Sequence, residues 1–103
     1  MKAAYFGIDG LRSCLALLEQ RGWEIAAVFT IEDDEYDHSA EICRYAQARR
    51  IPLHTRRVTP EDIRELERAG VTLSVTAGYP WKIPLSDTIM QVNLHPAYLP
   101  VGR

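Results

Sequence analysis

The chain has 103 residues, of which 47% are hydrophobic and 25% are charged, and its formal net charge is −2. This size and composition are typical of a single globular domain. The charge balance shows no basic excess of the kind that nucleic-acid-binding domains carry, so a nucleic-acid partner is not expected. No apolar run approaches the roughly 20 residues that a membrane span needs, and the first residues do not form a signal peptide. We therefore expect a cytoplasmic protein that does not bind membranes.

The two cysteines, Cys14 and Cys43, are too few for a disulfide framework or a metal-binding cluster. Each falls in a helical pattern beside apolar neighbours, so we expect a small buried or half-buried side chain at both positions. No metal site is predicted.

The first half of the chain alternates apolar runs with helical patterns. Residues 2–7 and 24–30 are predicted strands, and an acidic loop at 31–37 precedes a helix over roughly 38–50. The first helix has Asp9 as its expected N-cap and ends at Gly22. Its apolar positions are Leu11, Cys14, Leu15 and Leu18, and the core face of the second helix is formed by Ile42, Tyr45 and Ala46.

The second half continues the alternation. A short strand at 52–55 precedes Thr59-Pro60-Glu61-Asp62, in which a capping residue, a proline at the first helical position and acids in the first turn mark a helix start. That helix turns Ile63 and Leu66 inward and ends at Gly70. Strands are predicted at 71–76 and 89–94, separated by a loop over 77–84 and one helical turn at 85–88.

This alternation predicts an α/β fold with a Rossmann-like, doubly wound, mainly parallel sheet. In such sheets the ligand-binding loops follow the carboxyl ends of the strands. Three segments occupy that position, namely 7–10, 78–84 and 93–103, so candidate site residues are sought there.

The segment Gly7-Ile8-Asp9-Gly10 follows the first strand and opens a helix. It is not a dinucleotide-binding fingerprint, because the third glycine is missing. Either the tight turn requires glycine, or the backbone approaches a ligand closely here. Gly7 and Asp9 are therefore candidates for a substrate-site loop.

The loop Gly78-Tyr79-Pro80-Trp81-Lys82-Ile83-Pro84 is unusually stiff and apolar for a surface segment. It either packs its aromatic rings on the core or forms the wall of a pocket for a flat ring system. The candidate binding residues of this loop are Tyr79, Pro80, Trp81, Ile83 and Pro84.

Asn93 and His95 lie two residues apart at the end of the last predicted strand, so their side chains point to the same side. An amide can donate a hydrogen bond to a developing oxyanion, and an imidazole can transfer protons near neutral pH. This pair is typical of an acyl-transfer site, although a strand end with hydrogen-bonded side chains is the alternative. The proline-rich segment that follows, with Leu99 and Pro100, is expected to border the site.

These motifs resemble the N-terminal half of the catalytic domain of folate-dependent formyltransferases. That family includes the methionyl-tRNA, glycinamide ribonucleotide and sugar-nucleotide N-formyltransferases. The matching segments are Tyr5-Phe6-Gly7, Tyr79 to Pro84, Asn93-Leu94-His95, and Leu99-Pro100 followed by Arg103. The resemblance covers essentially the whole chain, residues 1–103.

The resemblance implies transfer of a formyl group from 10-formyltetrahydrofolate to a primary amine. By match of position, Asn93 stabilises the oxyanion of the tetrahedral intermediate and His95 takes part in proton transfer. The loop from Tyr79 to Pro84 lines the pteridine pocket, and Leu99-Pro100 shapes the mouth of the site.

The acid that orients the histidine in this family has no counterpart up to Arg103, so we expect the isolated chain to have little or no activity. We also expect an exposed sheet edge that favours homo-oligomers. The acidic run 32–37 stands where tRNA-acting members carry a basic insert, which favours a small-molecule amine such as an amino-sugar nucleotide. The alternatives are a non-catalytic or truncated folate-binding or interaction domain, a methionyl-tRNA formyltransferase, and an unrelated nucleotide binder.

Overall fold

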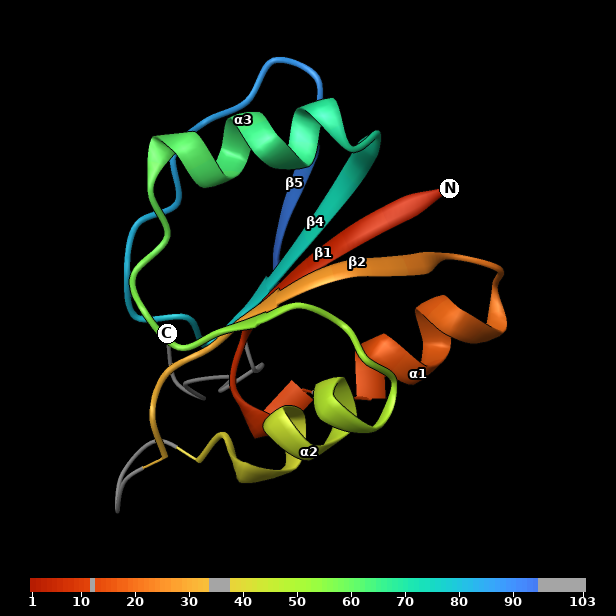
Figure 1. The fold of residues 1–103 in the computed structure, drawn as a ribbon, viewed down its shortest axis with the longest axis vertical. Coiled ribbons are helices and arrows are strands. Elements are labelled where there is room, and N and C mark those ends of the chain that lie inside the picture. The colour runs from red at the N-terminus through yellow and green to blue at the C-terminus, as the bar shows by residue number, and fades with distance from the viewer. Residues whose placement is uncertain (12, 34–37, 95–103) are drawn as a thin grey trace, which may run out of the picture.

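The computed structural model describes residues 1–11, 13–33 and 38–94, which form an α/β fold with a five-stranded, all-parallel sheet and three α-helices (Figure 1). The strands are β1 (Lys2–Gly7), β2 (Glu24–Phe29), β3 (Leu53–His54), β4 (Val71–Ala77) and β5 (Met90–Leu94). The helices are α1 (Ser13–Gln20), α2 (Ala40–Ala48) and α3 (Pro60–Arg68), with a short 3₁₀ helix, η1, at Asp9–Leu11. The predicted parallel strand–helix alternation is confirmed.

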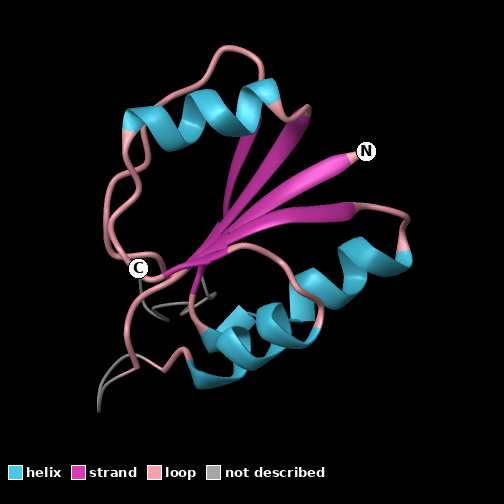
Figure 2. Cartoon of the chain, in the orientation of Figure 1, coloured by secondary structure: helices cyan, strands magenta, loops and turns pink. Residues whose placement is uncertain are grey.

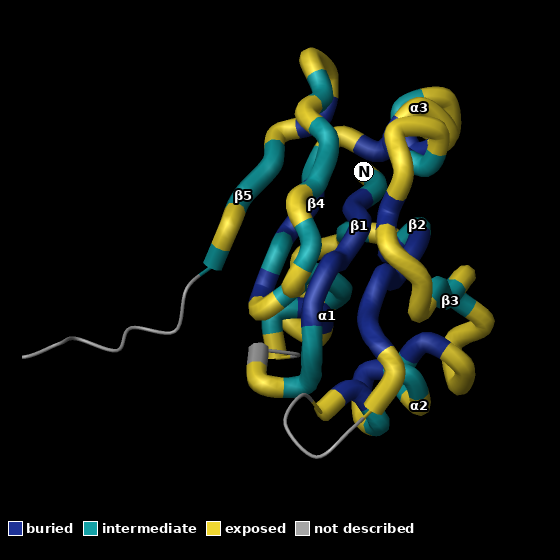
Figure 3. Tube along the Cα trace, turned by 90° about the vertical axis from the view of Figure 1, so that its left-hand side faces the viewer, coloured by how far each residue is buried: buried dark blue, intermediate teal, exposed yellow. Residues whose placement is uncertain are grey.

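The sheet order is β3-β2-β1-β4-β5, so β1 lies at the centre and β3 and β5 lie at the two edges. Helices α1 and α2 cover one face and α3 covers the other, which gives three layers (Figures 1 and 2). Strand β1 is almost wholly buried because both of its faces are covered, whereas β5 is partly exposed along its length (Figure 3).

Each face of the sheet has its own hydrophobic core, because alternate residues of a strand point to opposite faces. Ala3 and Tyr5 of β1 pack with Leu15 and Ile42 on the side of α1 and α2. On the side of α3, the buried residues are Ala4, Phe6, Ala27, Phe29, Val58, Ile63, Leu66, Val71 and Ile89. The predicted inward positions of α3 are therefore confirmed.

The predicted start of α3 is also confirmed. Thr59 and Asp62 form a reciprocal capping box, in which Thr59 Oγ1 accepts from the Asp62 N–H at 3.2 Å and Asp62 Oδ2 accepts from the Thr59 N–H at 2.8 Å. Arg56 donates two hydrogen bonds to the same carboxylate, at 2.7 and 2.8 Å. These contacts fix the segment that enters the helix.

The prediction that Asp9 caps the first helix is wrong. Its two carboxylate oxygens accept hydrogen bonds from the backbone N–H groups of Glu41 and Ile42, at 3.2 and 2.8 Å, so Asp9 caps α2. Asp33 accepts from Ser39 and Ala40 at the same helix start. The first backbone N–H groups of a helix have no acceptor within the helix. At the start of α2, the carboxylates of Asp9 and Asp33 accept from them.

The predicted helical turn at 85–88 is also wrong, because this stretch is an irregular extended segment with bends. Its polar groups are bonded to side chains instead: Ser86 Oγ accepts from the N–H groups of Thr88 and Ile89. Other boundaries differ by a few residues, as expected for helix and strand ends. For example, α2 begins at Ala40 rather than residue 38, and β3 has two residues rather than four.

Within the described residues, β5 pairs with β4 alone, so its outer edge has no partner there. Met90 on this strand is 69% exposed. No described helix combines the length and the apolar character that a membrane crossing requires.

Candidate functional site

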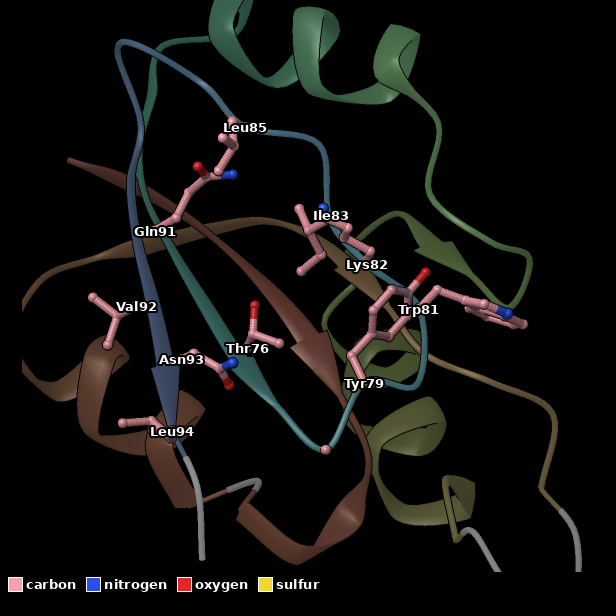
Figure 4. Close-up of a pocket in the computed structure, with 11 residues that line it drawn as sticks. Thr76, Tyr79, Trp81, Lys82, Ile83, Leu85, Gln91, Val92, Asn93 and Leu94 are labelled. Atoms are coloured by element: carbon pink, nitrogen blue, oxygen red, sulfur yellow. The ribbon is translucent and has the colours of Figure 1, made fainter.

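A cleft of about 470 Å³ opens at the carboxyl ends of β4 and β5, on the face of the sheet that carries α3 (Figure 4). We call it the β4–β5 cleft. It is lined by Thr76, Gly78, Tyr79, Trp81, Lys82, Ile83, Leu85, Gln91, Val92, Asn93 and Leu94. The two strands form its floor and the loop that joins them forms its wall. Open parallel sheets bind ligands at the carboxyl ends of their strands, typically where the strand order reverses. In this sheet the order reverses between β1 and β4, and the cleft lies one strand further, between β4 and β5.

The polar part of the floor is formed by Thr76 and Asn93, which are directly paired in the parallel register of β4 and β5. Figure 4 shows both side chains on the side of the strands that faces the loop. Neither side chain has a hydrogen-bond partner among the residues that the structure describes. The amide of Asn93 and the hydroxyl of Thr76 are therefore available to a ligand in the cleft.

Gln91 shares a face with Asn93, and both the nitrogen and the oxygen of its amide are hydrogen-bonded to the loop. Its Nε2 donates to the carbonyl of Pro84 at 2.9 Å, and its Oε1 accepts from the Ser86 N–H at 3.1 Å. Both contacts join the floor of the cleft to residues 84–86, the end of the loop that leads into β5. Gln91 therefore holds the wall of the cleft in place.

Tyr79 anchors the other end of the loop. Its hydroxyl accepts from the N–H of Val58 at 3.0 Å and donates to the carbonyl of Arg56 at 3.4 Å. Its ring packs edge-on against Phe6, with 5.6 Å between centroids, and against Trp81, with 5.4 Å. Burial raises the pKa of the Tyr79 hydroxyl, so it stays protonated at neutral pH.

Tyr79 and Ile83 supply apolar surface to the wall, since both are partly exposed and line the cleft. Trp81 is also a lining residue, but its indole points outward from the loop (Figure 4). Lys82, between Trp81 and Ile83, is exposed and has no ion-pair partner in the described part of the chain. The wall thus combines a flat ring, an aliphatic side chain and a positive charge. This composition suits a planar ligand with an anionic extension.

The predicted binding loop therefore divides into two groups. Tyr79, Trp81 and Ile83 line the cleft, whereas Pro80 and Pro84 are not among its lining residues. Pro84 instead accepts the hydrogen bond from Gln91. Tyr79 packs on the core, as the first interpretation of this loop predicts. Figure 4 shows the Trp81 indole pointing away from Thr76 and Asn93, and the pocket for a flat ring system stays a prediction.

Gly7 and Asp9 lie outside the β4–β5 cleft. A Cβ atom on Gly7 would lie 2.2 Å from the carbonyl oxygen of Ala77, so the glycine is required by the close approach of β1 to β4. Asp9 is occupied as the cap of α2. Both residues therefore contribute to the fold. Asp9 also lines a separate pocket beside the start of α2, and the predicted role of the two residues in a substrate loop is not tested.

His95, Leu99 and Pro100 lie outside the described residues, so their predicted places at the site are not tested. Seven residues that line the cleft were not among the candidates from the sequence: Thr76, Gly78, Lys82, Leu85, Gln91, Val92 and Leu94. Gln91 could have been found from the two-residue period that it shares with Asn93. Thr76 could not, because its place beside Asn93 depends on the register between two strands.

The lining of the cleft defines the chemistry that it can support. The described lining residues include no carboxylate and no imidazole, and no group of described His, Cys, Asp or Glu residues could hold a metal ion. The available polar groups are one amide, one hydroxyl and one ammonium. No family model matches the chain, and a search of the curated proteins finds no match to it.

Proposed function

We propose that this protein transfers a formyl group from 10-formyltetrahydrofolate to the primary amine of a small molecule, such as an amino-sugar nucleotide. The observation that carries the proposal is that Asn93 lines one cleft together with Tyr79 and Ile83 of the loop. The amide is the group that acyl transfer needs, and the wall is suited to a flat heterocycle. The proposal also assigns the fold to the formyltransferase type.

The ring of the folate is assigned to the wall. A pteridine is planar and largely apolar on its faces, so it can pack against the Tyr79 ring and the Ile83 side chain, which both line the cleft. The glutamate end of the folate is anionic, and the ammonium group of Lys82 can pair with it at the mouth of the cleft. Since Lys82 is exposed, this contact is expected to weaken at high salt.

The formyl group is assigned to the floor. The amine nitrogen adds to the formyl carbon of the folate to give a tetrahedral intermediate, and the bond from that carbon to the folate nitrogen then breaks. Asn93 Nδ2 donates a hydrogen bond to the formyl oxygen as negative charge develops on it. The proton lost by the amine goes to the departing folate nitrogen, a step that the sequence resemblance assigns to His95.

The choice of a small-molecule amine rests on charge. The chain is acidic overall, with a net charge of −2. Asp33, in the acidic run after β2, accepts hydrogen bonds from the Ser39 and Ala40 N–H groups at the start of α2. A tRNA acceptor requires positive surface for its phosphates. We therefore rank methionyl-tRNA below amino-sugar nucleotides as the acceptor, and we place the reaction in the cytoplasm.

A second candidate function is a folate-binding domain without catalytic activity. The observation that favours it is that the described lining of the cleft includes neither a carboxylate nor an imidazole. Such a lining can bind a folate, but by itself it has no group that transfers protons at neutral pH. The two candidates therefore differ in turnover and not in binding.

The test is a formyl-transfer assay on the natural gene product. The protein is incubated with 10-formyltetrahydrofolate and either an amino-sugar nucleotide panel or methionyl-tRNA, and the formylated amine is detected by mass spectrometry. Asn93→Ala is expected to reduce kcat by about 10²- to 10³-fold, as loss of an oxyanion donor does. Met90→Ala changes an exposed residue of the same strand and is the matched control.

Each outcome assigns the function differently. Formyl transfer that depends on Asn93 supports the proposal, and the acceptor that reacts names the substrate class. Folate binding without transfer to any amine supports the non-catalytic candidate. Absence of folate binding contradicts both.

A further inference from the structure

Thr76 is the polar group of the cleft that the proposed reaction does not yet use. It lies on β4 directly opposite Asn93, and its side chain shares the cleft with that amide (Figure 4). Its hydroxyl has no hydrogen-bond partner among the described residues. A hydroxyl with no partner in the described part of the fold can bind a ligand.

Packing does not explain why a hydroxyl stands at this position. Valine has nearly the same shape as threonine, and both favour strands. Valine occupies the preceding position of the same strand, where Val75 is 6% exposed and packs on the opposite face of the sheet. The hydroxyl of Thr76 therefore adds polarity without an evident contribution to the fold.

The surroundings of Thr76 direct a ligand oxygen toward Asn93. On the β1 side, Thr76 is paired with Phe6, whose ring is fully buried and stacks on Phe29 at 4.8 Å between centroids. On the β5 side it is paired with Asn93, which is exposed. A polar atom of a ligand can thus reach Thr76 only from the side on which the amide lies.

The spacing of the two strands allows both groups to bind a single atom. Neighbouring strands lie about 4.8 Å apart, and N–H···O and O–H···O hydrogen bonds span about 2.7–3.0 Å. One oxygen between the two side chains can therefore accept from the Thr76 hydroxyl and from Asn93 Nδ2 at the same time. Gln91, the other amide on this face, is held by two hydrogen bonds to the loop, and it is paired with Ser74 rather than with Thr76.

We propose that Thr76 is a specificity-determining residue, whose hydroxyl and the Asn93 amide together hold the acyl oxygen of the bound formyl donor. The inference rests on the proposed function and extends it, because it makes the cleft selective for the formylated over the unformylated folate. A lone amide offers this oxygen one donor, whereas the pair offers two from adjacent strands. The pair also fixes the direction in which the formyl group points.

The experiment compares two stable ligands that differ in the formyl group alone. The ligands are 10-formyl-5,8-dideazafolate and 5,8-dideazafolate, and their dissociation constants are measured by isothermal titration calorimetry. Thr76→Val removes the hydroxyl and keeps the shape, whereas Thr76→Ser keeps the hydroxyl and removes the methyl group. Thermal unfolding of each variant verifies that the fold is retained.

We expect the wild-type protein to bind the formylated ligand more tightly, and Thr76→Val to weaken that binding by about three- to tenfold, the effect of one hydrogen bond. The unformylated ligand should bind Thr76→Val as it binds the wild type, and Thr76→Ser should keep the wild-type preference. In an Asn93→Ala background, the factor by which Thr76→Val weakens binding of the formylated ligand should differ from the factor measured with Asn93 present, because the two groups share one oxygen.

Three results would overturn the inference. If the wild type binds both ligands equally, or if Thr76→Val keeps the preference for the formylated one, the hydroxyl does not hold the acyl oxygen, while the folate assignment stands. If Thr76→Val weakens both ligands equally, the hydroxyl acts on another part of the folate. If the wild type binds neither ligand, the proposed function fails and the inference fails with it.

Discussion

The contact that anchors the wall of the cleft can be tested with Tyr79→Phe, which removes one hydroxyl and keeps the ring. The phenyl ring can still pack against Phe6 and Trp81, so little apolar contact is lost. The substitution removes the hydrogen-bond acceptor of the Val58 N–H, which donates to the Tyr79 hydroxyl at 3.0 Å. Val58 is 3% exposed. A buried N–H left without an acceptor costs about 1–3 kcal/mol.

This cost is measurable in two ways. In urea unfolding, the free energy of unfolding of Tyr79→Phe should fall by about 1–3 kcal/mol, and for a chain of this size each 1 kcal/mol lowers Tm by about 4–8 °C. Because the hydroxyl joins the loop to the segment before α3, we also expect weaker binding of 10-formyl-5,8-dideazafolate. Burial raises the pKa of this hydroxyl, so the effect should be constant between pH 6 and about 9.

A matched control is Tyr45→Phe, which removes a hydroxyl that is bonded to Glu19 on the opposite face of the sheet. This variant should leave ligand binding unchanged, whatever it does to stability. If Tyr79→Phe unfolds within about 0.3 kcal/mol of the wild type, the Val58 N–H is not held by Tyr79, and the account of the wall is refuted.

Three further substitutions test the fold around the cleft. Asp9→Ala should destabilise the protein by about 1–2 kcal/mol in urea unfolding, because the first N–H groups of α2 lose their acceptor; an unchanged midpoint would mean that Asp9 is not that cap. Gly7→Ala should destabilise it by about 3 kcal/mol or more, since the new Cβ meets the Ala77 carbonyl at 2.2 Å. Gly10→Ala, whose Cβ meets nothing within 4 Å, should be tolerated, and equal losses at the two glycines would contradict the close approach of β1 and β4. Asp62→Asn should show its largest destabilisation at neutral pH. Hydrogen bonds from the adjacent guanidinium lower the pKa of Asp62, so its contribution is present above the unfolded pKa near 4 and is lost as pH falls below it. A difference from the wild type that does not shrink below pH 4 would refute that assignment.

The sequence predicted those features of the fold that depend on local signals. The apolar runs located all five strands, and Thr59 with Pro60 and Asp62 marked the start of α3, because a capping box is formed within four residues. The parallel arrangement followed from the alternation of strands and helices. The carboxyl edge of the sheet could therefore be named as the place of the site.

The features that the sequence did not predict depend on contacts between distant residues. Asp9 resembles an N-cap of the helix that follows it, but the fold brings it to α2, 32 and 33 residues away. The stretch 85–88 has no helical turn, because the Ser86 hydroxyl and the Gln91 amide take its polar groups. Local sequence preferences are overridden where such tertiary contacts are available.

In the candidate site, too, some residues could be predicted from the sequence and others could not. Asn93, Tyr79, Trp81 and Ile83 could be named from the sequence, because residue type and position at a strand end were sufficient. Thr76 could not, because its partner is set by the register of β4 against β5. The sequence also did not show that Tyr79 anchors the loop while Trp81 stays partly exposed, because this difference depends on the packing of Tyr79 against Phe6.

The measurement that tests the central claim most directly is an NMR titration of the chain with 10-formyl-5,8-dideazafolate and with its unformylated counterpart. We predict chemical-shift changes concentrated in the lining of the β4–β5 cleft for both ligands, with the Asn93 side-chain amide responding to the formylated ligand alone. No shift changes at saturating ligand, or changes concentrated away from this cleft, would contradict the account.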